Sequence, residues 1–311
     1  MMRGVVSAGM LLGLEALGLR GSFDAVYGSS AGALNAAYFL AGQARVGITG
    51  YLDESITRGF VDPLRVLRGR PAVDLDRVYR DVLVRRFPLD WEAYQRSGAA
   101  LVAMAPRADG GAGPASGPDS GPDPGVGSRL VALSGFRDLD DLLAALHASA
   151  RLPIVAGPPL TYRGMRLWDG GLVDRMPVQS ALADGYTHVL ALLTEPEGAR
   201  PRRAWALMER LVVAPRVARI SPALARVLVR RRATYEATRA LIRTLEKSWS
   251  GPPFVASITL PRGARRVLAA EMRRGPLLAG ARAGMLACLL AFGMGDESEA
   301  GRLADEWLAG G

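Results

Sequence analysis

The segment Gly28-Ser29-Ser30-Ala31-Gly32 restricts this chain to folds in which a strand turns sharply into a helix. Residues 23–27 read as a short extended run, and residues 33–41 read as helical. In a Gly-x-Ser-x-Gly turn the central residue is strained, and the glycines remove side chains that would collide with the strand and the helix. The pattern predicts that Ser30, and not Ser29, presents its hydroxyl at a helix N-terminus, where N–H groups favour developing negative charge.

A serine hydroxyl becomes a useful nucleophile only when a neighbouring base takes its proton. Asp169 is the favoured base, because Gly170 and Gly171 follow it and let the backbone turn tightly at the end of a predicted strand. The alternative base is His188, which would make the chain a histidine-dependent serine esterase. However, His188 opens the apolar run 188–193, and such a run is typical of a buried strand.

The composition gives little support to metal or disulfide chemistry. The 311 residues include one cysteine, Cys288, and two histidines, His147 and His188. A single cysteine forms no intrachain disulfide, and this set supplies no cysteine-based metal cluster. We interpret His147, beside a leucine stripe, as a packed or surface residue of a helix. We therefore expect neither a metal nor a cofactor.

Hydrophobic patterns place further elements along the chain. Strands are predicted at 99–105, 130–134, 188–193 and 254–260, and helices at 5–17, at 138–150 and from Ser221-Pro222 onward. Residues 107–128 are rich in Gly, Pro, Ser and Asp and predict a disordered surface loop. Because candidate catalytic residues lie on both sides of this loop, we expect one domain over 1–311. Its core would span 1–195, followed by a helical C-terminal region, 196–311.

Positive charge is concentrated between Arg200 and Arg232. This segment holds ten arginines and one acid, Glu209, whereas the charges of the remaining chain cancel. It predicts either a basic surface that docks on anionic lipid headgroups or a solvated helical face balanced by acids elsewhere. Trp205 is its one aromatic residue, so we expect no nucleic-acid partner.

No apolar run reaches the ~18 residues that a membrane-spanning helix needs. The longest, around 283–293, predicts a core helix. Residues 1–14 resemble a signal peptide, but Glu15 follows them directly and the sequence contains no small-x-small cleavage site there. We expect a cytoplasmic protein, with the basic segment as its route to the inner face of the membrane.

Together, four segments resemble the patatin-like phospholipase family. Arg3–Leu11 is similar to the end of the family's glycine-rich oxyanion motif and the helix after it, and Phe23–Leu34 resembles its nucleophile elbow. Ala148–Pro153 resembles the segment before the base, and Trp168–Pro177 resembles the Asp-Gly-Gly loop. The resemblance covers roughly residues 3–195.

This resemblance implies a three-layer α/β fold with a mainly parallel central sheet flanked by helices. It also implies a lipid acyl hydrolase of the phospholipase A or esterase type, with a Ser–Asp dyad and no metal. Ser30 would be the acyl nucleophile and Asp169 its base. The oxyanion and turn residues would be Arg3, Gly4, Gly28, Ser29, Ala31, Gly32, Gly170 and Gly171.

The sequence departs from the family pattern at two places. Only Arg3-Gly4 remains of the oxyanion motif Gly-Gly-Gly-x-Arg/Lys-Gly, with Met1-Met2 before it, so we expect a shortened form of a longer protein. Loss of one oxyanion donor lowers the rate by a factor on the order of 10²–10³. The alternative is therefore a weakly active or non-catalytic protein that binds lipid or a partner. The second departure is Arg175, where the family commonly has asparagine.

Overall fold

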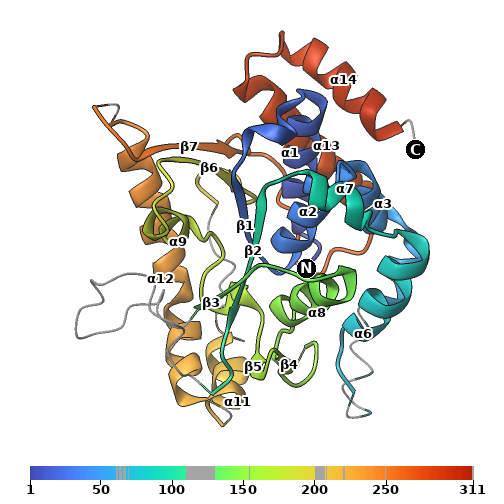
Figure 1. Ribbon diagram of the computed structural model, residues 1–311, viewed down its shortest axis with the longest axis vertical. Coiled ribbons are helices and arrows are strands. Elements are labelled where there is room, and N and C mark those ends of the chain that lie inside the picture. Colours follow the sequence, from blue (N-terminus) through green and yellow to red (C-terminus); the bar gives the residue numbers. More distant parts are fainter. Residues whose placement is uncertain are drawn as a thin grey trace.

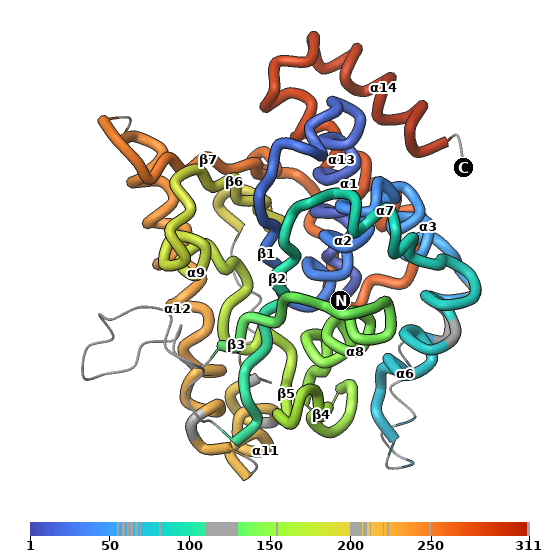
Figure 2. The backbone as a smooth tube through the Cα atoms, in the orientation of Figure 1, coloured from blue at the N-terminus to red at the C-terminus, as the bar shows by residue number. Residues whose placement is uncertain are grey.

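The computed structural model describes residues 1–309 apart from 61, 63, 64, 66, 67, 69, 110–129, 154, 200–206, 208, 220 and 249. It is a mixed α/β fold (Figures 1 and 2). The strands are β1 (Ala25–Ser29), β2 (Ala100–Pro106), β3 (Leu130–Leu133), β4 (Leu160–Tyr162), β5 (Met165–Leu167), β6 (His188–Leu193) and β7 (Phe254–Thr259). The α-helices are α1 (Gly4–Ala16), α2 (Ala31–Leu40), α3 (Ala44–Leu52), α4 (Glu54–Phe60), α6 (Leu75–Arg77), α7 (Trp91–Arg96), α8 (Leu139–Ser149), α9 (Val178–Ala183), α11 (Ala214–Ala218), α12 (Pro222–Leu245), α13 (Arg274–Ala291) and α14 (Glu297–Ala309). Two segments, η1 (Leu19–Ser22) and η4 (Gly170–Leu172), are 3₁₀-helices, and two others, η2 (Val78–Arg86) and η5 (Glu209–Val213), are π-helices.

The described strands form three small sheets rather than one. β2 pairs in parallel with β1 and antiparallel with β3, β6 pairs in parallel with β7, and β4 pairs antiparallel with β5. The expectation of one mainly parallel sheet is therefore not met among these strands. Arg163 and Gly164, at φ 46° and 74°, join β4 to β5, and such a tight hairpin connects only antiparallel neighbours.

The α/β class itself is confirmed, as is the helical character of the C-terminal region. β6 has the predicted bounds, and β2, β3 and β7 match the predicted strands within one residue at each end. The predicted helix 138–150 is α8, which begins at an Asp138 cap that accepts a hydrogen bond from the N–H of Asp141.

β2 lies between two layers of helices and is buried on both faces. Alternate side chains of a strand point to opposite faces. Those of Leu101, Ala103 and Ala105 join the core formed with α1, α2 and α8. Those of Val102 and Met104 join a second core formed with α11 and α12. This arrangement explains why the strand is apolar throughout, and it places β1 and β2 between helices on either side (Figure 1).

α1 and α13 cross at very short range in the main core. A Cβ built on Gly9 would lie 2.0 Å from the carbonyl oxygen of Ala281, and one on Gly284 would lie 2.1 Å from that of Val6. α1 is apolar on all sides, as expected of a buried helix, and α13 contains most of the predicted core run around 283–293. The contact joins the two ends of the chain, which supports our proposal of a single domain over 1–311.

α12 is the long helix predicted from Ser221 onward, and the Ser221 hydroxyl caps it by accepting a hydrogen bond from the N–H of Leu224 at 3.3 Å. Its side chains Leu228, Tyr235 and Ile242 are buried. In the described part of the chain, no helix is both long and apolar enough to cross a bilayer. Residues 110–128 of the predicted loop lie outside the described residues.

Candidate active site

β1 enters α2 through a turn centred on Ser30. This residue has φ 56° and ψ −124°, a conformation that a residue with a side chain adopts only under strain. Ser30 directly precedes the first residue of α2, yet its hydroxyl forms no capping hydrogen bond within the described structure. The turn therefore has the strained central residue expected from the sequence, and the hydroxyl is not used to start the helix.

The two glycines of this turn differ in how much space they have. A Cβ on Gly28 would lie 2.5 Å from the backbone nitrogen of Ala33, so only glycine allows β1 and α2 to approach this closely. A Cβ on Gly32 would meet no atom within 4 Å. The prediction that both glycines relieve a collision is correct for Gly28 and wrong for Gly32, because the α-carbon of Gly32 faces open space.

The two serines of the turn have different surroundings. The hydroxyl of Ser29 donates a hydrogen bond to the carbonyl oxygen of Asp174 at 3.0 Å. The backbone N–H of Ser30 donates to the Ser149 hydroxyl at 3.1 Å, and that hydroxyl donates to the carbonyl oxygen of Met104 at 2.7 Å. The Ser149 hydroxyl thus links the backbone of Ser30 to β2 by two hydrogen bonds.

Asp169 follows β5 and is buried, with 3% of its surface exposed. Its carboxylate accepts a hydrogen bond from the N–H of Gly171 at 2.7 Å, and its own N–H donates to the carbonyl oxygen of Arg151 at 2.9 Å. Burial raises the pKa of Asp169, while the positively charged N-terminus, the nearby Ser30 side chain and the hydrogen bond from Gly171 act in the opposite direction. The carboxylate therefore lies near Ser30, and its burial makes it a stronger base than an exposed aspartate.

Gly170 is what lets the Asp169 loop approach the sheet. A Cβ at this position would lie 2.2 Å from the carbonyl oxygen of Met104 and 2.8 Å from the hydroxyl oxygen of Ser29. A Cβ on Gly171 would meet only the carboxylate of Asp169, at 3.0 Å. The first glycine of the Asp-Gly-Gly segment is therefore the one that the packing requires.

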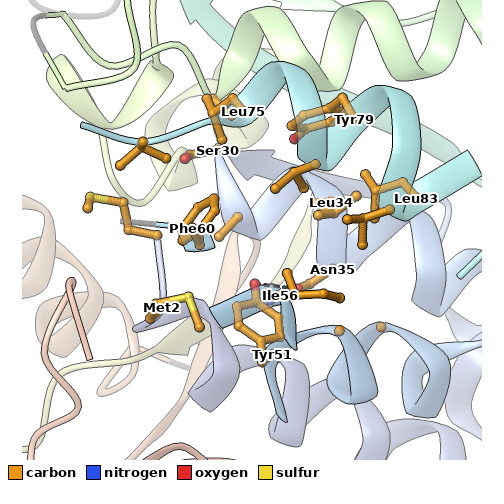
Figure 3. Close-up of a pocket in the computed structure, with 18 of the residues that line it drawn as sticks. Met2, Ser30, Leu34, Asn35, Tyr51, Ile56, Phe60, Leu75, Tyr79 and Leu83 are labelled. Carbon is orange, nitrogen blue, oxygen red and sulfur yellow. Dashed lines mark hydrogen bonds between the residues drawn. The ribbon is translucent and has the colours of Figure 1, made fainter. Parts of the chain in front are cut away.

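A cavity of about 110 Å³ opens beside Ser30 (Figure 3). Most of the side chains around it are aliphatic or aromatic. They come from α2, α3, α4, α6 and the residues just before it, η2 and the segment after α8, and they include Leu34, Val46, Ile56, Phe60, Val73, Leu75, Val78, Val82, Leu83, Leu152 and Val155.

The tyrosines of the cavity wall use their hydroxyls elsewhere. The Tyr38 hydroxyl donates to the carbonyl oxygen of Phe87 at 2.6 Å, and the Tyr51 hydroxyl donates to the side-chain oxygen of Asn35 at 2.9 Å. Because these polar atoms already have partners, the rings extend the apolar wall. The cavity is suited to a hydrocarbon rather than to a polar ligand.

Arg3 and Gly4 lie next to the Ser30 turn. A Cβ on Gly4 would be 2.6 Å from the β-carbon of Ala31, so glycine allows the start of α1 to touch the start of α2. The N–H of Gly4 donates to the carbonyl oxygen of Met1 at 2.9 Å. The Arg3 side chain forms an ion pair with Glu195 at 2.5 Å.

Comparison with known proteins agrees with this geometry. A family model described as patatin-like phospholipase matches residues 1–182. The chain belongs to the patatin-like phospholipase family. It is also 26% identical over 178 residues to the Escherichia coli (strain K12) protein YjjU, whose name describes it as uncharacterized. That match covers 56% of this chain and 44% of YjjU, so the chain spans less than half of the length of this relative.

Neither histidine of this patatin-like chain hydrogen-bonds to Ser30 or Asp169 within the described structure. His188 is exposed, and its ring lies 5.1 Å from that of Phe254. His147 is buried and stacks on Tyr79 at 4.6 Å, which agrees with the prediction of a packed residue. Burial and the neighbouring Arg151 lower the pKa of His147 to about 4. The arrangement gives no support to a histidine base.

Two site residues were not predicted from the sequence as contacts of the turn or of Arg3. Ser149 is a fully buried hydroxyl at the end of an apolar helix stripe, and Glu195 is a lone buried acid just after the apolar strand β6. Buried polar residues of this kind require partners, and this requirement is the signal that could have identified them. Arg175, where the family commonly has asparagine, lies 3.7 Å from Glu195.

Proposed function

We propose that this chain is a lipid acyl hydrolase in which Ser30 is the nucleophile and Asp169 is its base. The observation that carries the proposal is the strained Ser30 turn, which lies near the buried carboxylate of Asp169 and beside an apolar cavity. Membership of the patatin-like phospholipase family supports an ester of a lipid as the substrate.

The reaction would run in two halves. Ser30 attacks the ester carbonyl and passes its proton to Asp169, and the proton then goes to the alcohol that leaves, so that the acyl group remains on Ser30. Water next gives a proton to Asp169 and attacks the acyl-enzyme, and Asp169 returns the proton to the Ser30 oxygen as the fatty acid departs. A raised pKa helps Asp169 to accept each of these protons.

Negative charge on the carbonyl oxygen would be stabilised at the start of α2. The first N–H groups of a helix have no partner within the helix, and its dipole is positive at that end. The N–H of Ala31 is thus the natural first donor. The neighbouring Arg3–Gly4 segment borders this pocket, since Gly4 packs directly against Ala31, but the N–H of Gly4 already donates to the carbonyl oxygen of Met1 and supplies no second donor.

We assign the apolar cavity to the acyl chain of the substrate. Ser30, Leu34 and Leu75 lie at its wall, so a chain inserted there would bring its ester group to the nucleophile. Each buried methylene contributes about 0.8 kcal/mol, which favours esters of fatty acids over acetates. We expect kcat/KM to rise with acyl length until the cavity is filled.

We also propose that the protein works at an anionic membrane surface. In the described part of the segment Arg200–Arg232, Leu211 and Val229 are 63% and 53% exposed, and Arg210 and Arg230 stand next to them in the sequence. Exposed apolar side chains next to arginines are typical of proteins that bind the lipid interface. Binding to phosphatidylglycerol vesicles, lost in high salt and weakened in Leu211→Ser, is the expected result.

A fluorophosphonate probe tests the nucleophile directly. Ser30→Ala should abolish labelling, whereas Ser29→Ala should keep it, because the Ser29 hydroxyl is bonded to a carbonyl oxygen and takes no part in the attack. Hydrolysis of a fatty-acyl ester should follow the same pattern. Absence of labelling in the folded wild-type chain would contradict the proposal and favour a protein that binds lipid without cleaving it.

A further inference from the structure

The end of α8 contacts both residues of the proposed dyad through their backbone. The N–H of Ser30 donates a hydrogen bond to the Ser149 hydroxyl at 3.1 Å. Two residues further along, the carbonyl oxygen of Arg151 accepts a hydrogen bond from the N–H of Asp169 at 2.9 Å. Ser30 and Asp169 come from distant parts of the chain, so this helix terminus is a point of attachment that they share. Its geometry therefore helps to set the separation of the two residues.

The Ser149 hydroxyl is fully buried and forms hydrogen bonds in two directions. It donates to the carbonyl oxygen of Met104 at 2.7 Å, so its proton points toward β2 and an oxygen lone pair faces the N–H of Ser30. Met104 is the β2 residue that pairs with Ser29 at the end of β1. The hydroxyl thus connects the strand pair to the turn that begins where the pairing ends.

The peptide between Ser29 and Ser30 is the part of the strained turn that Ser149 holds. The carbonyl oxygen of Ser30 accepts hydrogen bonds from the N–H groups of Ala33 and Leu34 at 3.1 and 3.2 Å, so α2 fixes that side of the residue. The N–H side is fixed by Ser149. Without this acceptor the peptide could rotate, and the φ of 56° at Ser30 would relax toward an unstrained value.

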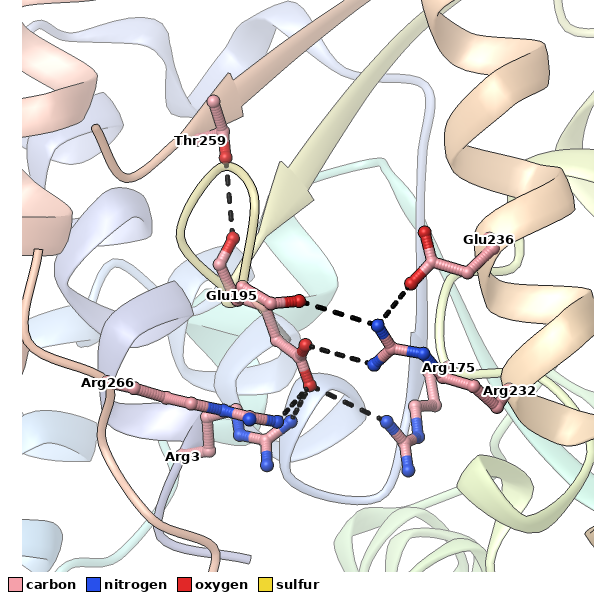
Figure 4. A network of polar contacts seen from close by, with 8 residues as sticks. Arg3, Arg175, Glu195, Arg232, Glu236, Thr259 and Arg266 are labelled. Atoms are coloured by element: carbon pink, nitrogen blue, oxygen red, sulfur yellow. Dashed lines mark hydrogen bonds and ion pairs between the residues drawn. The ribbon is translucent and has the colours of Figure 1, made fainter. Parts of the chain in front are cut away.

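Arg3 lies next to the turn but serves a different contact. Its guanidinium group forms an ion pair with the buried Glu195 (Figure 4). The hydrogen bond to the N–H of Ser30 comes instead from Ser149. Because this N–H is engaged, it is not a donor to the oxyanion, and the N–H of Ala31 keeps that role in the proposed reaction.

The end of α8 is itself held in place by the Arg151 side chain, which is 9% exposed. Its guanidinium group contacts Nε2 of His147 at 3.0 Å, both carboxylate oxygens of Asp76 at 3.3 Å and the carbonyl oxygen of Pro158 at 3.2 Å. Asp76 belongs to α6, which forms part of the cavity wall. A hydroxyl on a helix end that is anchored in this way can hold its partner in one position.

We propose that Ser149 is a positioning residue for the nucleophile, which keeps Ser30 in its strained conformation and at a fixed distance from Asp169. This assignment rests on the proposed function and adds a third residue to its site. Ser149 acts through the backbone of Ser30 and not on the substrate. A displacement of about 1 Å at a reacting group lowers the rate about a hundredfold. The effect should therefore appear in kcat rather than in substrate binding.

Ser149→Ala tests this role, with Thr238→Ala as the matched control. Thr238 carries another buried hydroxyl, which donates to the carbonyl oxygen of Thr234 at 3.1 Å within α12. We expect Ser149→Ala to lower both kcat on a fatty-acyl ester and the rate of fluorophosphonate labelling of Ser30 about tenfold to a hundredfold, with KM within about twofold of the wild type. Thr238→Ala should also lower the melting temperature but leave all three values unchanged.

Hydrogen exchange reports on the hydrogen bond itself and needs no activity. It is followed by NMR on protein with isotope-labelled serine. The N–H of Ser30 should exchange about tenfold faster in Ser149→Ala than in the wild type, because it loses its acceptor, and at the wild-type rate in Thr238→Ala. If Ser149→Ala melts far below the control, Ser149→Cys carries the test, since a thiol is close in size to a hydroxyl but a weak acceptor.

Each result decides the proposal. Slower catalysis and faster exchange at Ser30 in the Ser149 variant, but not in the control, support it. Unchanged kcat and labelling, an equal loss in Thr238→Ala, a rise in KM alone, or slower catalysis without faster exchange would each overturn it. If the wild type neither cleaves the ester nor reacts with the probe, the proposed function fails. The exchange rate of Ser30 then decides whether Ser149 holds the turn, and an unchanged rate would reject that role too.

Discussion

Replacing Gly28 and Gly32 by alanine, one at a time, should change the stability of the protein in opposite directions. In Gly28→Ala the new Cβ would lie 2.5 Å from the backbone nitrogen of Ala33, whereas ordinary contact begins at 3.4 Å. The obstacle is backbone and cannot rotate away, so α2 must move by nearly an ångström. Overpacking of this size costs about 2–3 kcal/mol in the free energy of unfolding. In Gly32→Ala the new Cβ meets nothing, and alanine is the better helix former by about 0.5–1 kcal/mol.

Urea unfolding of the two variants measures these differences, and a thermal melt should place Gly28→Ala about 5 °C or more below the wild type. The same shift of α2 displaces Ser30, so kcat/KM on a fatty-acyl ester should fall about a hundredfold in Gly28→Ala. The reasoning would be refuted if both variants lost stability equally, or if Gly28→Ala melted like the wild type.

Three further predictions follow from the packing and the buried acids. Gly284→Ala should lose about 3 kcal/mol or more in urea unfolding, because its Cβ would lie 2.1 Å from a carbonyl oxygen of α1, while Gly275→Ala at an open position of the same helix should not. Burial raises the pKa of Asp174 to about 6, so the free energy of unfolding should fall as pH rises from about 4 to 6. Asp174→Asn should abolish this dependence on pH and raise the free energy of unfolding by about 2–3 kcal/mol at pH 7. Asp169 must be ionised to act as a base, and burial raises its pKa. We therefore expect kcat/KM to rise with pH, with an apparent pKa above the ordinary range of a carboxyl group. A value of kcat/KM that does not change with pH would contradict this role.

Local sequence signals predicted the parts of the fold that depend on neighbouring residues. The uniform apolar run His188–Leu193 gave the exact strand β6, and the Asp138 and Ser221 caps marked the starts of two helices. The distinction between Ser30 and Ser29 followed from the turn pattern alone. In each case the determining residues lie within a few positions of one another, so periodicity and turn chemistry are sufficient.

Contacts between distant residues could not be predicted in the same way. Arg3 and Glu195 are 192 positions apart, and Ser30 and Ser149 are 119 apart, so no local pattern joins them. The division into three sheets depends on which strands pair with one another. The hydrophobic pattern within a strand does not specify its partner strand. The open space at Gly32 likewise depends on how α2 leaves the turn, which a pattern of glycines does not specify.

The rate of fluorophosphonate labelling of Ser30 in Asp169→Asn tests the central claim most directly, with His188→Ala as the matched variant. An amide cannot take the proton of the serine hydroxyl, so labelling should slow about a hundredfold or more in Asp169→Asn and stay near the wild-type rate in His188→Ala. Circular dichroism confirms that both variants are folded. Labelling at the wild-type rate in Asp169→Asn, or its loss in His188→Ala, would mean that another group accepts the proton and that Asp169 is not the base.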